Sequence, residues 1–351
     1  MKNQLIIFLT ISILSACSEK TTLNKGDYVI AEGRMPNLVK DSDDIIHLTY
    51  GYGDSIMYAY SADKGQSFSS PSLIFVLPKL AASHTRGPQI AASNSGLTVI
   101  ACNSLGDIFS FYKQSKSTWK PGGKVNDVDT VAKEGLMALD GHGDIAFAAW
   151  LDLRENAQNK IYGSRSNDGG MTWSKNIMIY TSPDTTVCEC CKPSVAVSGK
   201  NIYVMFRNWL DSNRDMFVIQ SMDGGNTFGK AQQLGNGNWK LNGCPMDGGN
   251  LAINNMGNLQ TVWRRKTKIY AATPGNAENE IGAGKGCTME TVNGKNVYAW
   301  IENGEIVFIK PGGEKKVLGK GSQAVLKGVN DDHVICVWEN EKQIHGAVVG
   351  L

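Results

Sequence analysis

Charged residues are scarce in this 351-residue sequence. Lys, Arg, Asp and Glu together make up 19% of it, and the formal net charge is only +2. Proteins that bind nucleic acid carry a basic patch or stripe, so this balance argues against a nucleic-acid partner. Helical periodicity is also scarce, and after residue 16 no apolar run is long enough to cross a bilayer as a helix.

Glycine, by contrast, is abundant, with 39 residues against 10 prolines. Short runs rich in Val, Ile, Tyr and Phe alternate with clusters of Gly, Asn and Asp along most of the chain. Runs of this length and composition, bounded by turn residues, indicate strands. The sequence therefore predicts an all-β protein.

Residues 1–16 are typical of a secretory signal peptide. Lys2 is followed by an apolar run over residues 5–14, and small residues then precede Cys17. This segment resembles a bacterial lipoprotein signal, which implies that Cys17 becomes a lipidated N-terminus. The expected location is the cell envelope, at the outer membrane, with the lipid as the only membrane contact. An ordinary signal peptide with a chance cysteine is the alternative. Residues 17–26 are expected to form the lipidated tether and residues 27–351 one domain.

Three short segments share the pattern S-x-D-x-G-x-[ST]-[FW], at residues 61–68, 166–173 and 221–228. In each, the Asp can accept hydrogen bonds from turn amides, the Gly can adopt a positive φ, and the aromatic residue can pack on the sheet. This pattern is the Asp-box, or BNR repeat, and the chain resembles the sialidase-like β-propeller superfamily.

Comparison of the sequence with itself finds seven copies of a strand that ends in a large or apolar residue. These end residues are Tyr50, Cys102, Trp150, Phe206, Trp263, Trp300 and Trp338. They recur about every 37 to 57 residues, the length of one four-stranded propeller blade. We label the strands of each blade A to D from the axis outward, so that these copies are strands B. Seven blades are preferred, and six remain an alternative if the two short late repeats are misread; the enzymes of the superfamily have six. The last repeat lacks strand D, which residues 28–31 could supply, closing the ring and removing a free edge.

Blade topology separates two faces of the predicted propeller. The D-to-A and B-to-C loops meet on one face, called here the loop face. The A-to-B and C-to-D turns, and with them Asp63, Asp168 and Asp223, lie on the opposite, turn face. The resemblance places chemistry on the loop face, so these three acids are expected to be structural.

Arginines and acids gather on the expected loop face. Sialidases hold a substrate carboxylate with three arginines, because a guanidinium pairs with a carboxylate through two hydrogen bonds. By resemblance, Arg34 in an Arg-Met-Pro motif is the first of these, and Asp54 is the general acid/base. The catalytic candidates are Arg34, Asp54, Arg207 and Arg264, and the further ligand-binding candidates are Arg86, Arg214 and Asp247. No Tyr and Glu pair matches the superfamily's nucleophile, and pairing of the arginines with neighbouring acids is the structural alternative.

Five of the eight cysteines fall in D-to-A loops of three consecutive blades: Cys188, Cys190, Cys191, Cys244 and Cys287. In an oxidising compartment the default is disulfides, with one thiol left over. The alternative is a site for a soft metal, copper or zinc, because thiolates favour these ions. A catalytic thiol is a third and weaker interpretation, since no His stands beside one. Cys102 and Cys336 are expected to be buried core thiols.

Three functions therefore follow from the loop face. The first is the binding or hydrolysis of a glycan or other small ligand, including exo-alpha-sialidase-like hydrolysis. The second is a metal-binding or redox role for the cysteine cluster. The third is a non-catalytic scaffold that binds a protein or glycan partner.

Overall fold

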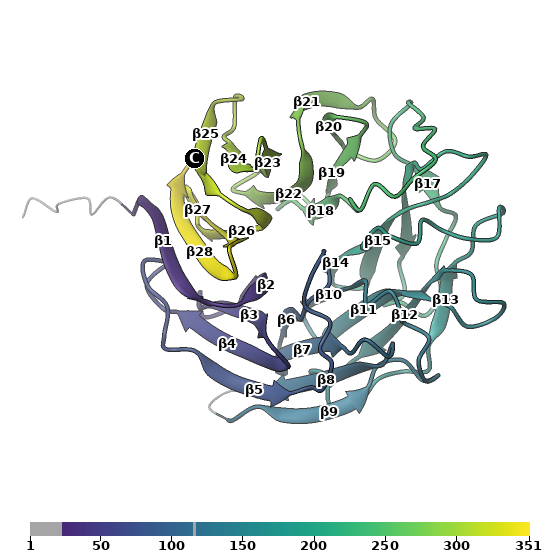
Figure 1. Ribbon diagram of the computed structural model, residues 1–351, viewed down its shortest axis with the longest axis horizontal. Coiled ribbons are helices and arrows are strands. Elements are labelled where there is room, and N and C mark those ends of the chain that lie inside the picture. Colours follow the sequence, from purple (N-terminus) through teal and green to yellow (C-terminus); the bar gives the residue numbers. More distant parts are fainter. Residues whose placement is uncertain (1–22, 115–116) are drawn as a thin grey trace, which may run out of the picture.

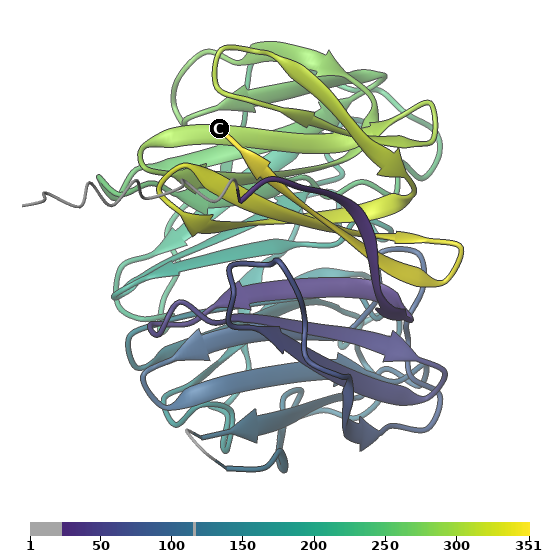
Figure 2. The same ribbon diagram turned by 90° about the vertical axis from the view of Figure 1, so that its left-hand side faces the viewer.

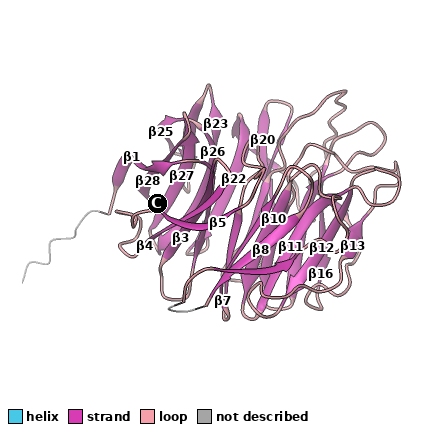
Figure 3. Cartoon of the chain, turned by 60° about the horizontal axis from the view of Figure 1, so that its bottom comes forward, coloured by secondary structure: helices cyan, strands magenta, loops and turns pink. Residues whose placement is uncertain are grey.

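Seven four-stranded antiparallel sheets form a ring in the computed structural model, which describes residues 23–114 and 117–351 (Figure 1). Strands and loops make up this part of the chain, and it contains no helix (Figure 3). The fold is thus an all-β propeller with seven blades, as predicted, and the six-blade alternative is wrong. Residues 1–22, with the predicted signal peptide and Cys17, lie outside the described residues. Among the described residues, no helix has the length and apolarity needed to span a membrane.

The strands of the first four blades, from A to D, are as follows. Blade one holds β2 (Arg34–Lys40), β3 (Ile46–Tyr52), β4 (Ser55–Ser61) and β5 (Ser72–Val76), and blade two holds β6 (Gln89–Ser93), β7 (Gly96–Cys102), β8 (Ile108–Lys113) and β9 (Lys120–Lys124). Blade three holds β10 (Met137–His142), β11 (Ile145–Asp152), β12 (Lys160–Ser166) and β13 (Ile177–Tyr180), and blade four holds β14 (Ser194–Ser198), β15 (Asn201–Arg207), β16 (Met216–Ser221) and β17 (Gln232–Gln233).

The remaining blades follow the same order. Blade five holds β18 (Asn250–Ile253), β19 (Leu259–Arg265), β20 (Lys268–Ala272) and β21 (Asn279–Ala283), and blade six holds β22 (Lys285–Val292), β23 (Lys295–Glu302), β24 (Glu305–Ile309) and β25 (Lys315–Lys320). Blade seven holds β26 (Ser322–Asn330), β27 (His333–Asn340), β28 (Gln343–Gly350) and, as its strand D, β1 (Lys25–Glu32).

The ring is closed by β1, which pairs antiparallel with β28 over a register that runs from Lys25–Val348 to Glu32–Gln343 (Figure 2). The closing strand begins at Lys25, two residues before the expected start of the domain. Both Lys25 and Tyr28 reach blade one, where they donate hydrogen bonds to the carbonyls of Gln66 and Gly65. These contacts tie the ends of the ring together on the turn face.

The core lies between neighbouring blades, where the strand B residues meet the adjacent sheet. Trp150, Trp263, Trp300 and Trp338 are fully buried, as is Tyr50 of blade one. Such residues each remove a large apolar surface from water, which is the main force that packs one blade onto the next. Cys102 and Cys336 are also buried in this core, as predicted.

Each repeated turn joins strands C and D and is built around its aspartate. Asp168 accepts hydrogen bonds from the Thr172 amide at 2.9 Å and from the Ser166 hydroxyl at 2.7 Å. Burial alone would raise the pKa of Asp168, but the hydrogen bonds from Thr172 and Ser166 outweigh it and lower this pKa. Asp63 and Asp223 make the same contacts within their own turns. All three aspartates stand on the turn face and hold local structure together.

We expect Asp168→Ala to lower the free energy of unfolding at pH 7 by about 1–2 kcal/mol, because several turn donors lose their acceptor. A carboxylate whose folded pKa is lowered stabilises the protein above its unfolded pKa and loses that effect as pH falls through the folded value. The difference between wild type and variant should therefore shrink below about pH 4. Denaturant titrations across pH measure it. Asp43→Ala is the matched control, since Asp43 is exposed on the same face; an equal effect of both changes would refute this role of Asp168.

Candidate functional site at the axial mouth

The D-to-A loops converge on a polar cavity of about 140 Å³ at the centre of the loop face. We call it the axial pocket. Its lining comes from the starts of strands A in six of the seven blades, and its polar members are Asn37, Thr85, Gln89, Lys192, Ser194, Asp247, Asn250, Thr288 and Gln323. Ring geometry thus gathers side chains that are far apart in sequence, as expected for a propeller.

Lys192 is the cation of this pocket. Its Nζ donates to Gln89 Oε1 at 2.6 Å, and the same oxygen lies 3.4 Å from Asn37 Nδ2. Among the described residues no carboxylate pairs with Lys192, and burial lowers its pKa to about 8. None of these three residues is among the candidates predicted from the sequence. The available signal was the position of Lys192, directly after the cysteine cluster and before the proline that leads into strand A.

Asp247 also lines the axial pocket, as its assignment to ligand binding would require, but it is heavily engaged. Its carboxylate accepts the Gly286 amide at 2.8 Å and lies 4.0 Å from Arg264 Nη1. The loop around it touches the neighbouring blade so closely that a Cβ at Gly248 would lie 1.8 Å from the Lys192 carbonyl oxygen. Only glycine fits there, and the contact fixes Asp247 and Lys192 relative to each other.

Arg207 is fully buried and acts as a bracket between loops. Its Nε donates to the carbonyl of Asp247 at 3.0 Å, Nη1 to that of Arg214 at 2.7 Å, and Nη2 to that of Arg264 at 2.9 Å. Arg264 stands nearby, since both guanidinium groups lie over the Trp239 ring, at 5.2 and 5.4 Å from its centroid. The structure brings these two arginines together, but it directs all three nitrogens of Arg207 to backbone oxygens.

The other sialidase-like candidates lie apart from the axial pocket. Arg34 pairs with Glu339 at 3.0 Å and lines a separate hollow between blades one and seven. Asp54 is exposed beyond the end of β3, and its carbonyl accepts the Leu77 amide.

Arg86 also has an acidic neighbour, Glu134, at 3.5 Å. The arginines of the loop face therefore each have a protein partner, the arrangement that the structural alternative expects.

The five loop cysteines divide into a trio that lies together, a disulfide partner and a thiol in the core between two blades. Cys188, Cys190 and Cys191 are buried together, and Cys190 also forms a disulfide with Cys244. Cys287 instead packs with the apolar residues between blades five and six. The disulfide agrees with one alternative of the sequence analysis, while the proximity of the trio agrees with the other.

Arg214 faces the trio. Its Nη1 lies 2.9 Å from Cys188 Sγ and 3.3 Å from the Glu189 carboxylate, and its guanidinium stacks on Trp209. The hydrogen bond with Cys191 and the charge of Arg214 lower the pKa of Cys188 to about 7, against the opposing effect of burial.

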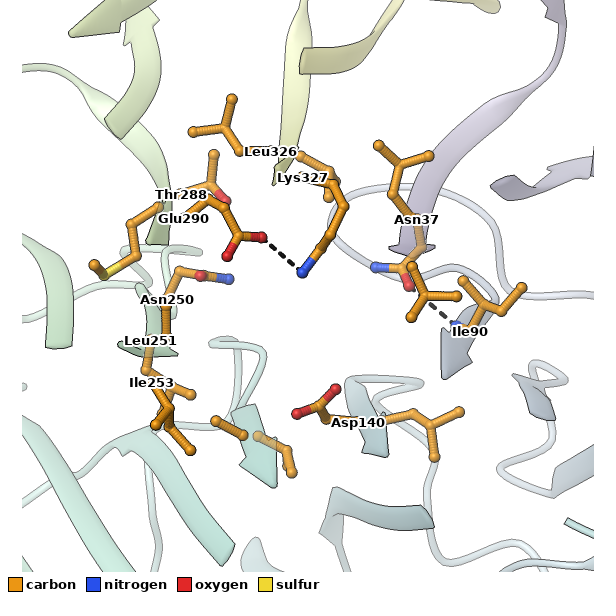
Figure 4. A pocket seen from close by; sticks show the side chains of 18 of the residues that line it. Asn37, Ile90, Asp140, Asn250, Leu251, Ile253, Thr288, Glu290, Leu326 and Lys327 are labelled. Carbon is orange, nitrogen blue, oxygen red and sulfur yellow. Dashed lines mark hydrogen bonds and ion pairs between the residues drawn. The ribbon is translucent and has the colours of Figure 1, made fainter. Parts of the chain in front are cut away.

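Behind the axial pocket lies a second cavity, of about 250 Å³, lined by strands A of all seven blades (Figure 4). The two cavities share lining residues, among them Asn37 and Asn250, so they follow one another along the axis. Lys327 and Glu290 form an ion pair of 2.6 Å in it, and Asp140 points into the cavity from the opposite side (Figure 4). Burial raises the pKa of Asp140, which accepts the Val197 amide at 2.8 Å.

Comparison with known proteins shows the fold. No protein-family model matches the chain, and no curated protein matches it in sequence. Among solved structures, it resembles an ulvan lyase bound to a repeat of glucuronic acid and 3-sulfated rhamnose, with 10% identity, 93% and 96% of the two chains covered, and a TM-score of 0.54. It also resembles the SapL1 lectin in complex with alpha-methyl fucoside, with 12% identity, 82% and 97% covered, and a TM-score of 0.51. The NanB sialidase of Streptococcus pneumoniae matches with 12% identity, 92% and 68% covered, and a TM-score of 0.46.

We expect Arg207→Met to lower the free energy of unfolding by about 3 kcal/mol or more, because three carbonyls, two of them buried, each lose a charged donor. Arg264→Met is the control, since Arg264 is partly exposed and its Nε donates to a single carbonyl, that of Lys266. Chemical unfolding of both variants measures the difference. Equal stability of the two variants would contradict the bracket role of Arg207.

Lys192 should leave a signature in the pH dependence of stability. Its folded pKa of about 8 lies below the ordinary lysine value of 10.5. Between these values the unfolded chain holds more protons, so this residue makes the free energy of unfolding rise with pH. Relative to wild type, Lys192→Met should lack that rise and be more stable at pH 7. If the difference in free energy of unfolding between wild type and Lys192→Met stays constant from pH 7 to pH 10.5, the pKa of Lys192 is not lowered.

Proposed function

We propose that this protein binds an acidic glycan in the axial pocket. The observation that carries the proposal is Lys192, a cation that lines the pocket and has no carboxylate partner among the described residues. A carboxylate or sulfate group of a sugar would supply that partner through a charge-assisted hydrogen bond.

The polar lining suits the rest of such a ligand. Asn250, Thr288 and Gln323 line it with amide and hydroxyl groups, which can donate to and accept from sugar hydroxyls. Small-ligand sites typically combine a concave surface with a few convergent polar groups of this kind. Two structures that share the fold, the ulvan lyase and the SapL1 lectin, are in complex with saccharides, which supports a glycan as the ligand class.

Binding is favoured over hydrolysis. Most glycoside hydrolases place two carboxyl groups on either side of the scissile bond. Asp247 is the only acid among the residues that line the axial pocket, and its oxygens already accept backbone amides. The sialidase-like alternative would use Arg34, Asp54, Arg207 and Arg264. Hydrolysis of a fluorogenic sialoside that is lost in Arg34→Ala would favour that alternative.

The repeated turns and the N-terminal segment complete the proposal. We infer that the chain is a sialidase-like Asp-box propeller, on the shared sequence pattern and the hydrogen bonds of the three turns. We further infer export and lipidation at Cys17, which would hold the protein in the bacterial cell envelope. Metabolic labelling with a fatty acid tests the anchor: wild type should carry the label, Cys17→Ser should not, and an unlabelled wild type would refute it.

Lys192→Met should weaken the binding of acidic oligosaccharides at least tenfold, because it removes the charged donor while keeping an apolar stem of similar length. Calorimetric titration of the purified protein measures the affinity, with panels of uronate, sulfated and neutral oligosaccharides as ligands. Affinity should also fall as pH rises through about 8, where Lys192 loses its proton.

Lys200→Met is the matched control, since Lys200 is exposed on the turn connecting β14 and β15, on the turn face. It should bind like wild type. No binding of any acidic ligand by wild type, or equal affinities of both lysine variants, would overturn the proposal. A preference for neutral sugars, unchanged in Lys192→Met, would do so as well.

A further inference from the structure

Three sulfur atoms meet beside the axial pocket in a buried site that glycan binding does not use. Cys188 Sγ lies 3.4 Å from Cys191 Sγ and 3.7 Å from Cys190 Sγ, and the third separation is 4.0 Å. The three side chains are almost inaccessible to solvent, at 0%, 1% and 9% exposure for Cys188, Cys191 and Cys190. All three come from the loop between β13 and β14.

These separations match the spacing of sulfur ligands around one metal ion. A tetrahedral site with metal–sulfur bonds of about 2.3 Å has sulfur–sulfur edges of about 3.8 Å. The three observed sulfur–sulfur separations lie slightly below and slightly above that edge length. Three sulfurs at these distances therefore present one face of a coordination tetrahedron before any metal is added.

We propose that Cys188, Cys190 and Cys191 bind a soft cation, Cu(I) or Zn(II), with Cys244 as the fourth sulfur ligand. Both ions are held by thiolates in proteins, and among the described residues no His nitrogen or carboxylate oxygen joins the three sulfurs within 4.8 Å of one another. Cys244, on the adjacent blade's D-to-A loop, is the fourth candidate because its sulfur is bonded to Cys190. Its sulfur is not among the three that all lie within 4.8 Å of one another, so it must shift once the bond is reduced. The proposal is independent of the acidic glycan, which uses Lys192.

Charge at the site suits thiolate ligands. Three or four thiolates around a monovalent or divalent cation leave a net negative charge in a buried place. Arg214 Nη1, at 2.9 Å from Cys188 Sγ, compensates part of it. Arg214 is itself 6% exposed and stacks on Trp209 at 4.3 Å, so its position is held by packing. A buried cation next to sulfur favours thiolate over thiol.

The disulfide makes this site dependent on redox state. In the structure, the bond between Cys190 and Cys244 occupies two of the four sulfurs. A small dithiol can open it: the dithiol is oxidised to its own disulfide, the Cys190–Cys244 bond breaks, and each cysteine gains one electron and one proton. When the cation binds, each ligating thiol releases its proton to water. The disulfide and the four-sulfur metal site therefore exclude one another.

Metal retention by the purified protein tests the proposal. The protein is reduced with dithiothreitol without oxygen, freed of reductant, and loaded with Cu(I) or Zn(II) in separate arms. It is then desalted against a competing chelator and its metal content measured. Reduced wild type should keep one equivalent of one of the two ions, and the arm that does so identifies the cation. The unreduced protein should keep less than a tenth of that amount.

Variants separate the site from other thiols. Cys188→Ser and Cys191→Ser should retain at least tenfold less metal, whereas Cys287→Ser and Cys336→Ser, which change buried thiols elsewhere, should match wild type. Cys244→Ser cannot form the disulfide but also lacks the fourth sulfur, so without prior reduction it should retain more metal than the unreduced wild type and less than the reduced wild type. Equal metal retention by the reduced wild type and the Cys188→Ser/Cys191→Ser double variant would overturn the proposal. So would a loss of metal in Cys287→Ser and Cys336→Ser as large as that in Cys188→Ser and Cys191→Ser.

Cobalt(II) provides a test that needs no variant. Bound to the reduced wild type, it should show a thiolate-to-cobalt charge-transfer band, which disappears when Zn(II) or Cu(I) is added. Absence of that band would overturn the proposal even if a cysteine variant failed to fold. Glycan titration of the metal-free protein is a separate readout, so failure of one proposal is distinguishable from failure of the other.

Discussion

The antiparallel ladder between β1 and β28 is the interaction on which the ring depends. Without β1, blade seven would end in a strand with unpaired backbone groups, a form of edge that sheets usually avoid. The ladder brings in Lys25 and Tyr28, which also hold blade one through its turn. Each inner strand is fixed by neighbours on both sides, so closure at this one seam sets the position of every blade around the axis.

That geometry explains how the axial mouth is assembled. Strands A begin at the loop face. The first residues of each strand A, and those just before it, therefore meet around the axis whatever their separation in sequence. Gln89 and Lys192, in blades two and four, thereby come within hydrogen-bonding distance. The packing of loops against one another adds precision: Gly248 lies against the Lys192 backbone, and Arg207 joins three loops through carbonyl oxygens. Binding chemistry and structural support thus share the same few loops.

The sequence predicted the blades well because each blade is a local unit. In six blades the strand B residue, such as Trp150 or Trp338, is aromatic, and in three blades the C-to-D turn is built around Asp168 or a counterpart within eight residues. The partners at the mouth were less predictable. Arg207 looks like a ligand residue in the sequence, yet its donors meet carbonyls from residues up to 57 positions away. Lys192 carries no local motif, because what distinguishes it is that no carboxylate of the described residues pairs with it. Such facts depend on long-range packing.

The closing ladder also has a mechanical consequence. Hydrogen bonds of an antiparallel pair run perpendicular to the strands. A force applied along β1 would therefore load its rungs to β28 together, in shear, instead of opening them one by one as in a zipper. Any load that the rungs do not carry would pass along the chain through Gly33 into β2, whose residues Met35 and Asn37 line the axial pocket. The ladder between β1 and β28 therefore stands between a pull on the N-terminal segment and the pocket residues of β2.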